Sequence, residues 1–283
     1  MLTELTTVLK PAQQGHYAVP AFDCVTDVLV RAVLDKAEER RSPVILMALE
    51  HDLKGKGMVY ISSLVRAVAP HYTIPVALHL DHAEDMDLVK RALDHGFTSV
   101  MFDGSTLPLE ENIRITREVV ELARRYEAST EAELGRVAGF EIGGSDTGEA
   151  VLTDPQGVAD FVAATGVDSL AVSIGTAHGI YVSTPTLHQE RLSEIRAASD
   201  VPLVLHGGSG TPEDQVREAI RRGITKINIY ADLRIALGKG FDRTAAETRR
   251  PDPLPDQLFS NMREEVMAAV NGKIDMCMSA DRV

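Results

Sequence analysis

The sequence predicts an α/β fold, a closed (β/α)8 barrel formed by a single domain over residues 1–283. Short runs of apolar or β-branched residues alternate with longer stretches of helical period, as parallel strands joined by crossover helices require. Eight such units follow one another without an evident linker, and that number favours a closed barrel over an open sheet. The length of 283 residues fits, because barrels of this type use about 250 residues as one domain.

The predicted strands are short and rich in residues that favour extended structure. In chain order they are residues 18–22, 44–47, 76–80, 99–102, 129–133, 169–172, 203–206 and 226–229. The amphipathic stretches between them predict helices, which include residues 27–40, 86–95, 111–126, 159–165, 187–198 and 213–222. The prolines of residues 251–255 interrupt the chain before an extra C-terminal helix over residues 257–271.

One connection, residues 135–153, is rich in glycine and exceeds the roughly 12 to 15 residues that loops in compact domains usually reach. Loops of this length are either functional or disordered. We expect a mobile active-site loop here, with a disordered insertion as the alternative.

Composition and charge exclude several classes of protein. The chain has 42 acidic and 29 basic side chains, and its net charge of −13 opposes binding of nucleic acid or anionic lipid over a broad surface. An anionic substrate therefore needs a local cationic site. The N-terminal residues contain no apolar run long enough for a signal peptide or spanning helix, and only two cysteines, Cys24 and Cys277, are present. We expect a cytoplasmic protein with free thiols.

Histidines follow three of the predicted strands, at the edge where barrels carry their chemistry. His82 follows the third strand, His178 the sixth, and His206 ends the seventh. Three histidines from three strand ends can converge on one metal, and three protein ligands with an open fourth position are typical of catalytic zinc. A single histidine is more often a surface or core residue, but the shared placement of all three favours a metal site.

Asp81 and His82 are neighbours, so regular strand alternation would direct them to opposite faces. Both can reach one site only if the strand stops near Asp81 and His82 lies on a turn, which makes residues 80–82 the expected rim. A carboxylate beside a ligand histidine can act as a base, or it can simply orient that histidine. His79, deeper on the same face as Asp81, is expected to be a packed and hydrogen-bonded support.

A glycine-rich segment follows the seventh predicted strand and includes Gly207, Gly208 and Ser209. Such a segment offers backbone N–H groups to a phosphate at the start of the next helix, although it can also be a simple helix cap. Phosphate sites in barrels are often formed by the loops after strands seven and eight. That position favours a phosphate site in this segment and after residues 226–228.

Five ordered motifs resemble the class II fructose-bisphosphate and tagatose-bisphosphate aldolase family. They are LHLDH at 78–82, EAELG at 131–135, IGTAHG at 174–179, LHGGSG at 205–210 and KINI at 226–229, with AVPAF at 18–22 as a further match. The resemblance covers nearly the whole chain. It implies a zinc-dependent lyase on a TIM barrel that reversibly cleaves a phosphorylated ketose into dihydroxyacetone phosphate and an aldehyde, commonly as a homodimer or homotetramer.

The resemblance also implies roles for individual residues. Zinc is expected on His82, His178 and His206, with Asp81 exchanging the proton of the hydroxyl at the cleaved bond. Two carboxylates, Asp103 and Glu133, match residues that hold a neighbouring metal position or order the histidines. The phosphate cradle of the family, where members often bind Na+ or K+, is matched by Gly179, Gly207, Ser209 and Asn228. Glu141 matches a mobile loop glutamate proposed to move the proton at the nucleophilic carbon.

Two departures from the family pattern concern the substrate. Asp23 stands where the family usually has an asparagine that touches substrate, and Ala231 replaces a threonine that commonly binds the first phosphate. A carboxylate repels phosphate. We therefore hypothesise that Asp23 favours an aldehyde half with hydroxyl or basic groups over one with a second phosphate.

Two other functions fit part of the pattern. A zinc hydrolase on a barrel would use zinc-bound water as nucleophile with Asp81 as base, but a neutral substrate needs no phosphate cradle. A non-catalytic accessory subunit would be expected to have lost ligands, whereas the three histidines and Asp81 are all present.

Overall fold

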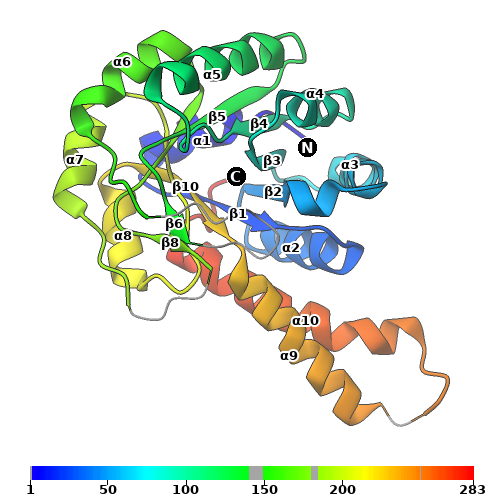
Figure 1. Ribbon diagram of the computed structural model, residues 1–283. Coiled ribbons are helices and arrows are strands. Elements are labelled where there is room, and N and C mark those ends of the chain that lie inside the picture. Colours follow the sequence, from blue (N-terminus) through cyan, green and yellow to red (C-terminus); the bar gives the residue numbers. More distant parts are fainter. Residues whose placement is uncertain (1, 140–148, 180–183, 249) are drawn as a thin grey trace.

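The computed structural model describes residues 2–139, 149–179, 184–248 and 250–283. Parallel strands close into a barrel in the order β1-β10-β9-β7-β5-β4-β3-β2, with β1 paired to both β2 and β10 (Figure 1). The strands are β1 (Val19–Asp23), β2 (Val44–Leu49), β3 (Val76–Ala83), β4 (Ser99–Phe102), β5 (Ser129–Leu134), β7 (Ser169–Val172), β9 (Leu203–Leu205) and β10 (Ile224–Ile229). The predicted closed barrel is confirmed.

Helices cover the outside of the barrel. Those between the strands are α2 (Asp27–Glu39), α3 (Gly57–Val68), α4 (Met86–Asp94), α5 (Leu109–Arg124), α6 (Pro155–Thr165), α7 (Gln189–Ala198) and α8 (Glu213–Arg221), with short 3-10 turns η1 (Glu50–Leu53) and η2 (Ala69–His71). Alternate strand residues face the helices, while the intervening ones fill the barrel, as period-two alternation requires. α1 (Leu5–Gly15) precedes β1, and its Leu5 and Leu9 pack with interior residues such as Val19 and Ile45.

Two features of the fold were not specified by the sequence pattern. A two-residue pairing joins β6 (Ala138–Gly139) to β8 (Ala177–His178) beside the barrel. The expected C-terminal helix is present as α10 (Pro255–Met276), but it pairs with a preceding helix, α9 (Ala231–Glu247). Of the glycine-rich loop expected at 135–153, residues 140–148 lie outside the described residues.

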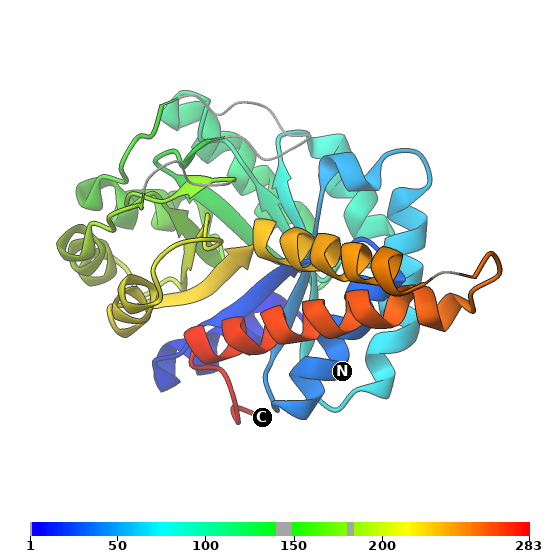
Figure 2. The same ribbon diagram turned by 90° about the horizontal axis from the view of Figure 1, so that it is seen from below.

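α9 and α10 form an arm that projects from the barrel (Figures 1 and 2). α10 also packs on α2, which anchors the arm to the barrel. The contact between the two helices of the arm is close at Gly240, where a Cβ atom would lie 2.4 Å from the Cα of Met262. No helix among the described residues has both the length and the hydropathy needed to cross a membrane.

We predict that Gly240→Ala lowers the free energy of unfolding by about 1–3 kcal/mol, because the added methyl group overpacks against backbone atoms that cannot move independently. The matched control is Gly272→Ala in α10, where no atom lies within 4 Å of the new Cβ. That variant should gain up to about 1 kcal/mol from helix propensity. Urea unfolding followed by circular dichroism measures both, and equal stabilities would contradict the packing described for Gly240.

Candidate active site

A β-bulge at the end of β3 brings Asp81 and His82 into one site. Leu80 pairs with Val100 and Ala83 with Phe102, so β3 has one residue more than β4 in this interval. His82 takes a left-handed backbone conformation, with φ of 46°, which is uncommon outside glycine. Regular alternation therefore breaks between Leu80 and Ala83, as expected, but His82 does not lie on a turn. β3 continues to Ala83, and the extra residue of the bulge replaces the expected turn.

The three histidines predicted from the strand ends lie together. The ring centroids of His82 and His206 are 4.5 Å apart, those of His82 and His178 are 4.8 Å apart, and those of His178 and His206 are 5.8 Å apart. One ring nitrogen of each histidine lies within 4.8 Å of the corresponding nitrogens of the other two. The residues come from β3, β8 and the end of β9, so closure of the barrel is what brings them together.

Carboxylates fix the orientation of two of the rings. Nδ1 of His82 lies 2.8 Å from Oδ2 of Asp103, and Nε2 of His206 lies 3.0 Å from Oε1 of Glu131. If each of these nitrogens carries the hydrogen, the lone pairs of His82 Nε2 and His206 Nδ1 face each other. Those two atoms are only 2.7 Å apart. Such lone pairs repel unless a proton or a metal cation lies against them, and a third imidazole at the same point favours the metal.

The electrostatic environment favours the neutral, metal-binding form of His178 and His206. Burial, together with His82 and His206, lowers the pKa of His178 well below its usual value. Burial and His82 also lower the pKa of His206, against the opposing effect of Glu131. Neutral imidazole is the ligand form, so the set of donors fits a divalent metal ion.

Asp81 is buried beside the histidines and is tightly held. Its two carboxylate oxygens accept hydrogen bonds from Nδ2 of Asn228 at 3.1 and 3.0 Å, and Oδ1 lies 3.5 Å from Nε2 of His79. Burial alone would raise the pKa of Asp81, but the charge of His82, the hydrogen bond from His79 and the charge of Lys226 hold it well below its usual value. Asp81 is therefore an ionised carboxylate with a fixed orientation.

A buried lysine supports the site in a way that the sequence pattern did not reveal. Lys226 in β10 is fully buried, and its Nζ donates to both carboxylate oxygens of Glu131, at 2.9 and 2.8 Å. The same Nζ lies 3.3 Å from Nε2 of His79. Nδ1 of His79 lies 2.8 Å from Ser99 Oγ, as expected for a packed and hydrogen-bonded support. Burial would raise the pKa of Glu131, but Lys226 and His206 lower it to about 2. A lysine inside a predicted barrel strand was the available signal.

The glycine-rich segment after β9 is shaped by close backbone contacts. Gly207 has φ of 68°, and a Cβ there would lie 2.4 Å from the carbonyl oxygen of Ala177. Gly208 donates its N–H to the carbonyl of Asn228 at 3.0 Å, so this N–H already has a partner. Oγ of Ser209 accepts from the N–H groups of Tyr230 and Asp232, at 3.1 and 3.4 Å. The segment is thereby tied to the start of α9.

The remaining predicted residues lie around this centre or outside the described chain. Asp23 is buried at the end of β1, and Gly179 follows β8 with φ of 88°. Glu133 accepts the N–H of Val137 at 2.9 Å, and its other oxygen is buried without a hydrogen-bond partner among the described residues. Burial and the charge of Asp103 raise the pKa of Glu133 well above its usual value. Glu141 lies outside the described residues.

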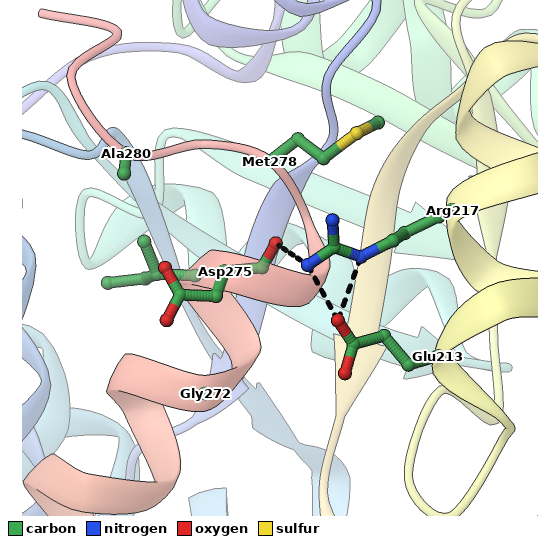
Figure 3. A pocket seen from close by; sticks show the side chains of 7 residues that line it. Glu213, Arg217, Gly272, Asp275, Met278 and Ala280 are labelled. Atoms are coloured by element: carbon green, nitrogen blue, oxygen red, sulfur yellow. Dashed lines mark hydrogen bonds and ion pairs between the residues drawn. The ribbon is translucent and has the colours of Figure 1, made fainter.

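A separate depression of about 610 Å3 lies between α8 and the end of α10 (Figure 3). Its Arg217 donates to Glu213 at 2.8 Å and to the carbonyl of Asp275 at 3.1 Å. Because the only cation that lines it is already paired within the described chain, this depression has no candidate chemistry.

Comparison with known proteins identifies the relatives of this chain. The family model for class II fructose-bisphosphate aldolases matches residues 3–282. The structure of the YdjI aldolase from Escherichia coli K12 is 34% identical, covers 100% of this chain and 99% of its own, and superposes with a TM-score of 0.88. A candidate fructose-1,6-bisphosphate aldolase from Coccidioides immitis is 33% identical, with 99% of this chain and 98% of that chain covered and a TM-score of 0.87. The fructose-bisphosphate aldolase of Campylobacter jejuni shares the fold at 22% identity, with 100% of this chain and 97% of that chain covered and a TM-score of 0.85.

We predict that Lys226→Met lowers the free energy of unfolding by about 3–5 kcal/mol, because it leaves the buried carboxylate of Glu131 without its cation. The double variant Lys226→Met/Glu131→Gln removes both charges and should recover at least about half of that loss. Urea unfolding in the presence of chelator measures both without a contribution from bound metal. If Lys226→Met alone is as stable as the wild type, the ion pair between Lys226 and Glu131 does not support the site.

Proposed function

This chain belongs to the class II fructose-bisphosphate aldolase family, and we propose that it works with zinc bound by His82, His178 and His206. It is an aldolase, a lyase that reversibly cleaves a phosphorylated ketose into dihydroxyacetone phosphate and an aldehyde. The observation that carries the zinc proposal is the 2.7 Å approach of His82 Nε2 to His206 Nδ1, with a carboxylate behind each ring. Family membership disfavours the hydrolase and accessory-subunit alternatives.

Three imidazoles with carboxylate partners and a fourth position left for solvent or substrate are typical of catalytic zinc. When bound, the metal ion supplies Lewis-acid stabilisation of the negative charge that develops on the ketose oxygens. Asp103 and Glu133 lie with His82 in a second group of possible ligand atoms, within 4.8 Å of one another. This grouping supports a neighbouring metal position. The alternative role of Asp103 is to orient the ring of His82.

Asp81 is proposed to take the proton from the hydroxyl at the cleaved bond and to return it in the direction of synthesis. Its low pKa makes it a weak base, so its contribution comes from position: Asn228 and His79 fix a charged carboxylate beside the histidines. Removal of this proton leaves the bond free to break towards the aldehyde. Glu141 stays a candidate for the proton at the nucleophilic carbon, without support from the described residues.

The phosphate of dihydroxyacetone phosphate is proposed to bind at Gly179, Gly207, Gly208, Ser209 and Asn228. Support comes from the sharp backbone at Gly207, which only glycine accommodates, and from the junction with the start of α9. Asn228 keeps one acceptor, Oδ1, which is buried and unpaired among the described residues. A substrate hydroxyl or a monovalent cation, Na+ or K+, fits that acceptor.

The proposal also covers the oligomeric state, the cellular location and the domain organisation of the protein. The exposed apolar side chains of the arm support a homodimer or homotetramer. Cys24 and Cys277 are buried and not bridged, which supports a reducing, cytoplasmic location. The whole of residues 1–283 is proposed to act as one domain.

We predict that Asp81→Asn lowers kcat by about 10²–10⁴-fold while the protein keeps its full zinc content, because it removes the base and no ligand. His178→Ala, by contrast, should lose zinc and activity together. Metal analysis of the purified variants, combined with a coupled assay for dihydroxyacetone phosphate, separates the two outcomes. Loss of zinc from Asp81→Asn would instead make Asp81 a residue that mainly supports the ligand set.

We further predict that Asp23→Asn raises kcat/KM for ketose bisphosphates relative to monophosphates by on the order of ten-fold, since it removes a negative charge near the aldehyde half. Asp160→Asn, an exposed carboxylate on α6, is the matched control and should leave the ratio unchanged. An unaltered ratio in Asp23→Asn would remove this residue from substrate selection.

A further inference from the structure

A further group of possible ligand atoms lies inside the barrel beside the three histidines. It consists of His79, Asp81 and Glu131, each of which offers one atom within 4.8 Å of those of the other two. All three side chains are buried. Nε2 of His79 lies 3.5 Å from Oδ1 of Asp81 and 4.0 Å from Oε2 of Glu131. One imidazole and two carboxylates form a set of donors that divalent metal ions bind in proteins.

A lysine supplies a cation to this group. Nζ of Lys226 lies 2.9 and 2.8 Å from the two carboxylate oxygens of Glu131, and 3.3 Å from Nε2 of His79. The charge of Lys226 also acts on Asp81, the third member of the group. The ammonium group therefore lies against the same atoms that a metal ion would bind.

The topology of the barrel sets the position of this ammonium group. β10, which contains Lys226, lies opposite β4 in the closed barrel, four strands away in either direction. The group of ligand atoms comes from β3 and β5, the two strands that flank β4. The long side chain of Lys226 thus crosses the interior, and its charged end lies between the atoms that β3 and β5 provide. A lysine that served only as the partner of Glu131 would need no contact with β3.

We propose that the ammonium group of Lys226 occupies the position of a metal ion in this group and thereby confines zinc to the three histidines. The inference rests on the proposed function, in which Asp81 exchanges a proton with the substrate. A divalent ion held by His79 and Glu131 would take Asp81 as a further ligand and tie up the base. The ammonium group balances the carboxylates through hydrogen bonds and, as part of β10, is not exchanged for ions from solution.

The outer contacts of the group also fit a metal position. Nδ1 of His79 lies 2.8 Å from Ser99 Oγ, which can hold the hydrogen on Nδ1 and leave Nε2 as the ligand atom. The carboxylate of Asp81 is fixed by Nδ2 of Asn228 at 3.1 and 3.0 Å. Loss of the ammonium group would leave this arranged set of donors with two negative charges and without the cation of Lys226.

Metal content in a chain without the three-histidine site tests the proposal. His178→Ala, which should lose its zinc, gives the baseline after equilibrium dialysis of the full chain against zinc and analysis by mass spectrometry. His178→Ala/Lys226→Ala should bind about one zinc ion more per chain, because alanine opens the position of Nζ to an ion. Addition of Asp81→Asn or Glu131→Gln to that double variant should weaken zinc binding at least about ten-fold, because each removes a charged ligand.

An ordinary ion pair gives different results. If Lys226 only neutralises Glu131, its removal admits water and the zinc content of His178→Ala/Lys226→Ala stays at the baseline, which would overturn the proposal. Zinc uptake that Asp81→Asn leaves unchanged would also contradict it. If the double variant is unfolded in chelator, zinc should restore its circular dichroism spectrum, since the ion replaces the lost cation, and a chain that zinc does not refold would contradict the proposal as well. These results do not depend on aldolase activity, whereas failure of the proposed function would appear in the wild-type assay.

Discussion

The approach of His82 Nε2 to His206 Nδ1, at 2.7 Å, is the constraint on which the rest of the site depends. Two ring nitrogens can be held so close only if each ring is fixed from behind. Asp103, just after β4, holds His82, and Glu131 in β5 holds His206. Glu131 in turn is held by Lys226 from β10, across the barrel. The site is thus a chain of contacts that only a closed barrel brings together.

Charge within this buried set also favours a cation. The pKa values of Asp81, Asp103 and Glu131 are all lowered, so these groups are carboxylates, and Lys226 balances one of the three. Unbalanced charge in a protein interior is costly. A metal ion at the three histidines, in place of the charge on His82, would compensate the negative charge that Lys226 leaves. The barrel is therefore arranged around a metal ion even where its residues do not touch that ion.

Periodicity and strand-end chemistry predicted the barrel and the convergence of His82, His178 and His206, because both depend on topology that repeats along the chain. What they did not predict depends on contacts between distant residues. The adjacency of Asp81 and His82 indicated a break in the strand, but the hydrophobic pattern does not show that the break is a bulge of one residue. Lys226 pairs with Glu131, 95 positions away, and Asn228 with Asp81, 147 positions away, so neither partner is visible locally. α9 was missed because its outward face mixes the apolar side chains of Ile235 and Phe241 with charged ones, which departs from the amphipathic pattern of a covered helix.

The most direct test of this account is the coupled detection of dihydroxyacetone phosphate released from a panel of ketose mono- and bisphosphates, before and after chelation. We predict release that chelator abolishes and added zinc restores. Release that persists without metal, or no release from any ketose by protein with bound zinc, would contradict it.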